Sequence, residues 1–134
     1  MNIVRSGLIL LLLPLLLWSL QAAAAVTDEI HFKKGEAMGT VRGQVTTTKT
    51  YQFRARKGQS FTVNLAPDGG DKGNLTLTLY AYCGEEFGAP LVSESLRWEG
   101  KLPCTDKYTV DVTPSREAMQ AARSQRYALQ VTIR

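Results

Sequence analysis

Apolar and polar side chains alternate along most of this chain, and that period of two constrains its fold more than any other feature. The alternation is clearest at residues 51–56, 60–65 and 75–82, where every second residue is apolar. An extended chain with this pattern places its apolar residues on one face and its polar residues on the other. These segments are therefore predicted to be strands that each bury one face.

Five more segments continue the pattern, at residues 29–33, 40–45, 95–102, 108–112 and 127–133. Turn residues separate the segments, including Gly58 and a stretch at 84–90 that contains glycine and proline. About eight short strands with no long helical pattern between them are typical of an antiparallel sandwich or barrel. We predict an all-β fold, an antiparallel β-sandwich in which one apolar face per strand supplies a single core.

The segment at residues 115–125 breaks the alternation just before the last strand. Four of its residues suit one or two helical turns, with Ser115 as the N-cap: Ala118, Met119, Ala121 and Ala122. A short helix and an irregular loop are equal alternatives for this segment. In both cases it is a connection, and connections are where a rigid scaffold commonly carries its binding residues.

The N-terminal residues predict export from the cytoplasm. Arg5 precedes an apolar run at residues 8–17, and small residues with an A-x-A pattern follow at 22–25. This order is typical of a secretory signal peptide. A membrane anchor is the weaker alternative, because the run is shorter than the roughly 20 apolar residues that span a bilayer. We expect a cleaved signal peptide at 1–25, a single mature domain at 26–134 and no membrane association after cleavage.

The chain contains two cysteines, Cys83 and Cys104. In an exported protein two cysteines form a disulfide by default, because the space outside the cytoplasm is oxidising. Cys83 ends one predicted strand and Cys104 precedes another, so a bridge would join a loop to the start of a strand. Closing a loop of about 20 residues stabilises a fold by roughly 3 kcal/mol in the chain-entropy model. We predict a Cys83–Cys104 disulfide.

The charge balance argues against a nucleic-acid partner. The chain has 16 Lys and Arg against 12 Asp and Glu, and the basic residues are scattered among the acidic ones. Nucleic-acid-binding proteins instead gather Lys and Arg on one face, with aromatic residues between them. We expect a mixed, solvated surface.

No arrangement of residues in the sequence is typical of an enzyme or of a metal site. His31 is the only histidine, so no second imidazole is available to share a metal ion. The acidic pairs Glu85 with Glu86 and Asp68 with Asp71 lie in glycine-bearing loops, where carboxylates commonly form turns. The nucleophile, zinc and phosphate-loop motifs are missing. We expect no catalytic residue, no metal ion and no cofactor.

Several short landmarks occur along the chain in a characteristic order. They are residues 32–35 (FKKG), Gly43, residues 51–59 (YQFRARKGQ), Leu102 with Pro103, residues 108–110 (YTV), Arg116 and the closing strand at 127–133. With these landmarks the mature chain resembles the periplasmic inhibitors of g-type lysozyme and, more loosely, the secreted pre-peptidase C-terminal-like sandwich domains. Together the landmarks cover nearly the whole mature domain.

The resemblance implies a periplasmic protein that binds a g-type lysozyme, or another cell-wall lytic enzyme, and blocks its active-site cleft with the connection before the last strand. In this chain the connection holds Arg116, with Ser115, Gln120 and Arg123 beside it. Members of the family carry a second arginine four residues after the first, and Gln120 stands at that place. They also carry an aromatic residue in the hairpin between the second and third strands, and residues 46–49 have none. The resemblance makes Arg116 the residue expected to enter the cleft.

A second hypothesis keeps the fold without the inhibition. A secreted sandwich of this kind also suits a binding module for a cell-wall glycan or a partner protein. Tyr80, Tyr82, Arg97 and Glu99 are predicted to point outward, and binding surfaces use such residues. Ordinary cross-strand pairing is the competing interpretation, since tyrosine suits exposed strand positions.

Overall fold

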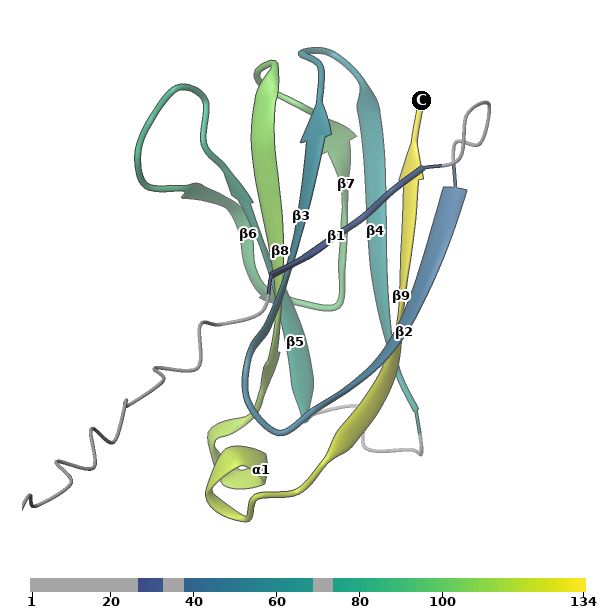
Figure 1. Ribbon diagram of the computed structural model, residues 1–134, viewed down its shortest axis with the longest axis vertical. Helices are drawn as coiled ribbons and strands as arrows, with labels where there is room; N and C mark the ends of the chain where they lie inside the picture. The colour runs from purple at the N-terminus through teal and green to yellow at the C-terminus, as the bar shows by residue number, and fades with distance from the viewer. Residues whose placement is uncertain (1–26, 33–37, 69–73) are drawn as a thin grey trace, which may run out of the picture.

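The computed structural model describes residues 27–32, 38–68 and 74–134 of the chain. These residues form two packed β-sheets and one short helix (Figure 1). The elements are β1 (Thr27–Glu29), β2 (Met38–Val45), β3 (Lys49–Ala55), β4 (Ser60–Pro67), β5 (Leu75–Ala81), β6 (Ala89–Ser95), β7 (Arg97–Lys101), β8 (Asp106–Pro114), α1 (Arg116–Gln120) and β9 (Gln125–Ile133). The signal peptide expected at 1–25 lies outside the described residues. No helix within the described ranges is long and apolar enough to cross a membrane.

The strands are divided between a five-stranded sheet in the order β1-β3-β8-β5-β6 and a four-stranded sheet in the order β2-β9-β4-β7. Neighbouring strands are antiparallel except β1 and β3, which run parallel. The prediction of an all-β, largely antiparallel β-sandwich is therefore confirmed. The described part of the chain has nine strands, against the eight or so expected.

The core lies between the two sheets, and the alternation of side chains builds it. In β3 the residues predicted to face inward, Tyr51, Phe53 and Ala55, are buried. Phe53 stacks on Phe61 of β4, with 4.7 Å between ring centroids, and on Tyr108 of β8 at 5.4 Å. Each large ring removes on the order of 150–250 Å² of surface from water. These three rings therefore join the two sheets at the centre of the domain.

The sequence pattern does not predict β6. This strand is at the edge of the five-stranded sheet, contains Pro90 and pairs with β5 through two register shifts. Edge strands of this kind tolerate proline and irregular pairing, so no alternation marks them. Leu96 also differs from expectation, because it lies in the bend between β6 and β7 and is 39% exposed.

The first strand is displaced from its expected position at residues 29–33. β1 ends at Glu29 and pairs in parallel with β3. Ile30 follows the strand, is buried, and donates its backbone N–H to the carbonyl of Gln52 at 2.8 Å. The apolar residue therefore enters the core directly after a short edge strand, and His31 beside it is exposed.

A buried pair of tyrosines joins the two sheets near their edges. The hydroxyl groups of Tyr51 in β3 and Tyr127 in β9 are hydrogen-bonded at 2.5 Å. Burial, followed by this hydrogen bond, raises the pKa of Tyr127 well above its usual range, so its hydroxyl stays protonated at neutral pH. Gly43 of β2 lies opposite Tyr127 in the strand register. A Cβ atom there would lie 2.5 Å from the Tyr127 hydroxyl oxygen and 3.0 Å from that of Tyr51.

We expect the substitution Gly43→Ala to lower the free energy of unfolding by about 1–3 kcal/mol, as overpacking of a filled core does. The added methyl group would separate the two hydroxyl groups or displace the Tyr127 ring. Urea denaturation measures the change. Gly39→Ala is the matched control, because Gly39 lies in the same strand and its Cβ would meet nothing within 4 Å. Equal midpoints for the two variants would contradict the expected packing role of Gly43.

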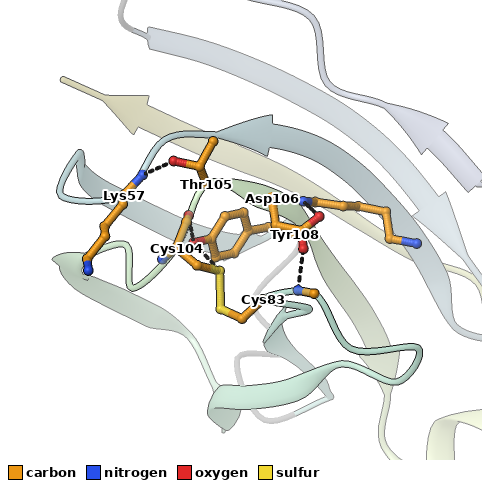
Figure 2. Close-up of a disulfide and its surroundings, with 8 residues drawn as sticks. Lys57, Cys83, Cys104, Thr105, Asp106 and Tyr108 are labelled. Atoms are coloured by element: carbon orange, nitrogen blue, oxygen red, sulfur yellow. Dashed lines mark hydrogen bonds between the residues drawn. A yellow bond between two sulfur atoms is a disulfide. The ribbon is translucent and has the colours of Figure 1, made fainter.

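The predicted disulfide is confirmed. Cys83 and Cys104 are bonded, with their Cα atoms 5.4 Å apart (Figure 2). The bridge joins the turn after β5 to the turn before β8. The hydroxyl of Tyr108 donates to the Cys104 carbonyl at 2.5 Å and accepts from the Cys104 N–H at 3.1 Å. A core tyrosine thus also fixes the backbone at the bridge.

Further hydrogen bonds hold the loops around the disulfide. The Asp106 carboxylate accepts from the backbone N–H of Lys107 at 2.7 Å and from that of Gly84 at 2.5 Å. These two bonds hold the pKa of Asp106 below its ordinary value of 3.8. The stability that they contribute is therefore complete above that ordinary value and is lost as the pH falls through the lowered one. Thr105 adds a bond from the Lys57 N–H at 2.9 Å (Figure 2).

Candidate functional site

The connection between β8 and β9 forms the helix α1 at one end of the sandwich (Figure 1). β8 belongs to the five-stranded sheet and β9 to the four-stranded sheet, so α1 crosses from one sheet to the other. Ser115 is the N-cap, and its Oγ accepts the backbone N–H of Ala118 at 3.1 Å. Of the two alternatives for this segment the structure has the short helix, and the predicted cap at Ser115 is confirmed. We call residues 115–124 the α1 segment.

The C-terminal end of α1 closes in a defined turn. The Ala122 N–H donates to the Met119 carbonyl at 3.0 Å, and the Arg123 N–H donates to the Ala118 carbonyl at 3.1 Å. This pair of bonds is the Schellman arrangement, in which the residue after the C-cap adopts a left-handed conformation. Ala122 has φ 49°, which suits glycine better than alanine. The turn fixes the backbone at Arg123 relative to the helix.

The α1 segment is held in place by contacts with the rest of the sandwich. Ala118 is fully buried on the inner face of the helix. The Ser115 N–H donates to the carbonyl of Asn74 at 2.7 Å. On the other side, the Gln44 side chain of β2 donates to the Ser124 hydroxyl. Both ends of the segment are therefore tied to neighbouring parts of the fold, and little ordering remains to be lost on binding.

The exposed side of the α1 segment carries two arginines together with the acidic Glu117 and the partly exposed Met119. Arg116, Gln120 and Arg123 are all exposed. Arg116 and Gln120 are four residues apart in the helix, which places them on the same face. Within the described residues no hydrogen bond or ion pair engages the Arg116 guanidinium. A cation at the first helical position is also unfavourable to the helix dipole, so Arg116 does not serve the stability of α1. A guanidinium in this position can meet a carboxylate in a bidentate pair.

The connection between β2 and β3 lies at the same end as the α1 segment. Thr48 in this connection has its hydroxyl 3.2 Å from that of Thr113, close to where β8 enters α1. The expectation of a hairpin here is wrong, because β2 and β3 belong to different sheets and the connection crosses between them. The connection, at residues 46–48, is short and has no aromatic side chain.

The residues named for the second hypothesis do not form one surface. Tyr80 lies in β5, in the five-stranded sheet, and Tyr82 follows that strand. Arg97 and Glu99 lie in β7, in the four-stranded sheet, where they form an ion pair at 2.9 Å. Sequence reasoning also missed Phe87, which is 80% exposed in the loop between β5 and β6. A bulky aromatic residue in a glycine-bearing loop was the available signal.

The described ranges contain no cluster of three or more His, Cys, Asp or Glu side chains that could hold a metal ion. His31 has its Nε2 atom 3.7 Å from a carboxylate oxygen of Glu29, and both side chains are largely exposed. The α1 segment, with its exposed arginines and fixed backbone, is the candidate site of this domain.

Comparisons with known proteins agree with the fold. No protein-family model matches the chain, and no curated protein matches it in sequence. Solved structures do match. One is PliG from Aeromonas hydrophila, a periplasmic lysozyme inhibitor of g-type lysozyme, with a TM-score of 0.65 and 24% identity over 81% of this chain and 96% of that chain. Another is PliG from Salmonella Typhimurium, described in the same words, with a TM-score of 0.61 and 22% identity over 81% and 97%.

A more distant structural match is the pre-peptidase C-terminal domain of a collagenase from Bacillus anthracis. Its TM-score is 0.52 and its identity 12%, over 83% of this chain and 97% of that domain. At these identities the likeness establishes a shared fold. The resemblance read from the sequence landmarks, to the g-type lysozyme inhibitors and more loosely to these domains, is confirmed at that level.

Proposed function

We propose that this protein is an exported, periplasmic inhibitor of a g-type lysozyme. The observation that carries the proposal is the fold shared with two inhibitors of g-type lysozyme over nearly their whole length. Both of those proteins are described as periplasmic, which agrees with the signal peptide expected at residues 1–25. The α1 segment is the part of the surface that would enter the active-site cleft.

The chemistry of the target supports a role for Arg116. Glycoside hydrolases generally place carboxylates on both sides of the bond that they cut. The Arg116 guanidinium is exposed and permanently charged, and within the described residues no acidic side chain occupies it. It can therefore pair with a cleft carboxylate through two parallel hydrogen bonds. Such a pair would occupy a catalytic group and exclude the substrate.

The backbone around Arg116 supports the same role. The N-cap bond of Ser115, its bond to Asn74 and the buried Ala118 hold α1 in one position. A binding loop that is already ordered loses less conformational entropy on association than a flexible one. Arginine held in this way is among the residue types that dominate protein interfaces.

Gln120 and Arg123 have secondary roles in this proposal. Gln120 lies one helical turn from Arg116 and offers an amide in place of a charge. Arg123 adds a second positive charge beyond the turn at Ala122. Neither places a guanidinium where a second helical arginine would stand, so Arg116 is expected to contribute most of the binding free energy.

A lysis assay tests the proposal. Purified mature protein is titrated against a g-type lysozyme acting on isolated bacterial cell walls. We expect micromolar protein to slow lysis in a saturable manner. Chicken-type and invertebrate-type lysozymes run in parallel define how selective the inhibition is. An unchanged rate with the g-type enzyme, at concentrations well above that of the enzyme, would exclude inhibition as the function.

A further inference from the structure

A hollow of about 280 Å³ lies on the outer face of the five-stranded sheet, away from the α1 segment. Tyr80 and Tyr82 form one side of it, and Thr109 and Asp111 of β8 contribute polar groups. Phe87 extends from the loop between β5 and β6 to the same hollow. Three aromatic rings and a carboxylate thus converge at a place that no step of the proposed inhibition uses.

The polar part of the hollow is fixed by the strand register. Thr50 of β3 pairs with Asp111 of β8, and Tyr80 of β5 pairs with Thr109. The Thr50 hydroxyl donates to one carboxylate oxygen of Asp111 at 2.8 Å. This bond orients the carboxylate, whose second oxygen forms no hydrogen bond within the described residues. Thr109 is only 6% exposed at the base of the hollow.

The aromatic part is fixed by the loop that follows the disulfide. Gly88 packs so closely that a Cβ atom there would lie 2.8 Å from Cβ of Tyr80 and 3.1 Å from the ring of Tyr82. The loop is held at its start by the Cys83–Cys104 bridge. Phe87, which is 80% exposed, therefore projects from a loop whose backbone rests on the two tyrosines.

The charges around the hollow select among possible occupants. The ammonium group of Lys107 lies 4.1 Å from the centre of the Tyr82 ring, so a second cation on that ring would be repelled. Asp111 repels an anion, and the polar base of the hollow disfavours a purely apolar chain. A sugar ring is uncharged, has an apolar face to stack on an aromatic side chain, and has hydroxyl groups that can donate to Asp111.

We propose that this hollow binds the sugar rings of a polysaccharide, through stacking on Phe87 and contact with Tyr80 and hydrogen bonding to Asp111, while Tyr82 supports the loop that carries Phe87. The hollow and the α1 segment lie on separate parts of the domain, because Tyr82 follows the end of β5 while α1 follows the opposite end of the neighbouring β8. A glycan bound here would hold the protein on a polysaccharide surface while α1 stays free.

A titration with the β-1,4-linked tetramer of N-acetylglucosamine, followed by two-dimensional NMR, tests this site. We expect saturable shifts of the amide resonances around Phe87, Gly88 and Asp111. Phe87→Ala is expected to weaken binding about tenfold, because an exposed aromatic contact is lost without loss of core packing. Met38→Ala is the matched control, since Met38 is exposed on the other sheet and should leave the affinity unchanged.

Three outcomes would overturn the proposal. The first is that the tetramer produces no shifts, and the second is that it binds Phe87→Ala and the unmodified protein equally well. Alternatively, tetramethylammonium binds in the hollow in a salt-sensitive manner and Asp111→Asn abolishes its binding, which assigns the site to a cation. The test is separate from that of the proposed function, because Arg116→Ala should leave the sugar titration unchanged.

Discussion

Replacing both Cys83 and Cys104 with serine is expected to lower the free energy of unfolding by about 3 kcal/mol, the chain-entropy value for a loop of this length. The two cysteines are 21 residues apart in sequence, and the bridge restricts the unfolded chain across β6 and β7. Cys83 is exposed and Cys104 is half-buried, so serine fits both positions with little packing loss. Urea denaturation of the double variant and the unmodified protein measures the difference.

Chemical reduction supplies the control for this prediction. The unmodified protein denatured in excess dithiothreitol should show the same loss as the double serine variant. The bonds of Tyr108 and Asp106 remain after reduction and hold the native turns in place. The native fold should therefore survive at low denaturant, and inhibition through α1, at the other end of β8, should be unaffected. A double variant as stable as the oxidised protein would show that the bridge does not constrain the unfolded state.

Local patterns predicted local features of this fold well. The inward faces of β3, β4 and β5 follow directly from alternation, because each strand has a single buried side. The N-cap at Ser115 follows from side-chain chemistry within one helical turn. Both inferences depend on residues that are close together in the sequence.

Features that depend on distant residues could not be obtained in the same way. Alternation does not reveal which sheet a strand joins, so the sequence does not show that the connection between β2 and β3 crosses between sheets instead of forming a hairpin. The separation of Tyr80 and Tyr82 from Arg97 has the same cause. The anchoring of α1 by Asn74 and by Gln44 arises only from the folded arrangement. The exposed residues of the α1 segment were predicted from the sequence, whereas the contacts that fix them were not.

Substituting Arg116→Ala is expected to weaken inhibition of a g-type lysozyme by about 2 kcal/mol or more, which is roughly 30-fold in the inhibition constant. The physical reason is the loss of a guanidinium that would meet a cleft carboxylate in a dry interface. Arg116→Lys should recover only part of the effect, because an ammonium group keeps the charge but lacks the planar fork. The inhibition constants come from lysis rates measured over a range of inhibitor concentrations.

Stability measurements separate this effect from unfolding. Arg116 is exposed, its guanidinium forms no hydrogen bond within the described residues, and it stands at a helix position that disfavours a cation, so the alanine variant should unfold within about 0.5 kcal/mol of the unmodified protein. Arg54→Ala is the matched control, because Arg54 is an exposed arginine of β3 that pairs with Lys107 at the start of β8, whereas α1 follows the other end of β8. If Arg54→Ala weakens inhibition as much as Arg116→Ala does, general charge attraction accounts for the binding. If neither variant changes the inhibition constant, the contact lies outside the α1 segment. The protein would then be an inhibitor, but the proposal that Arg116 enters the cleft would be wrong.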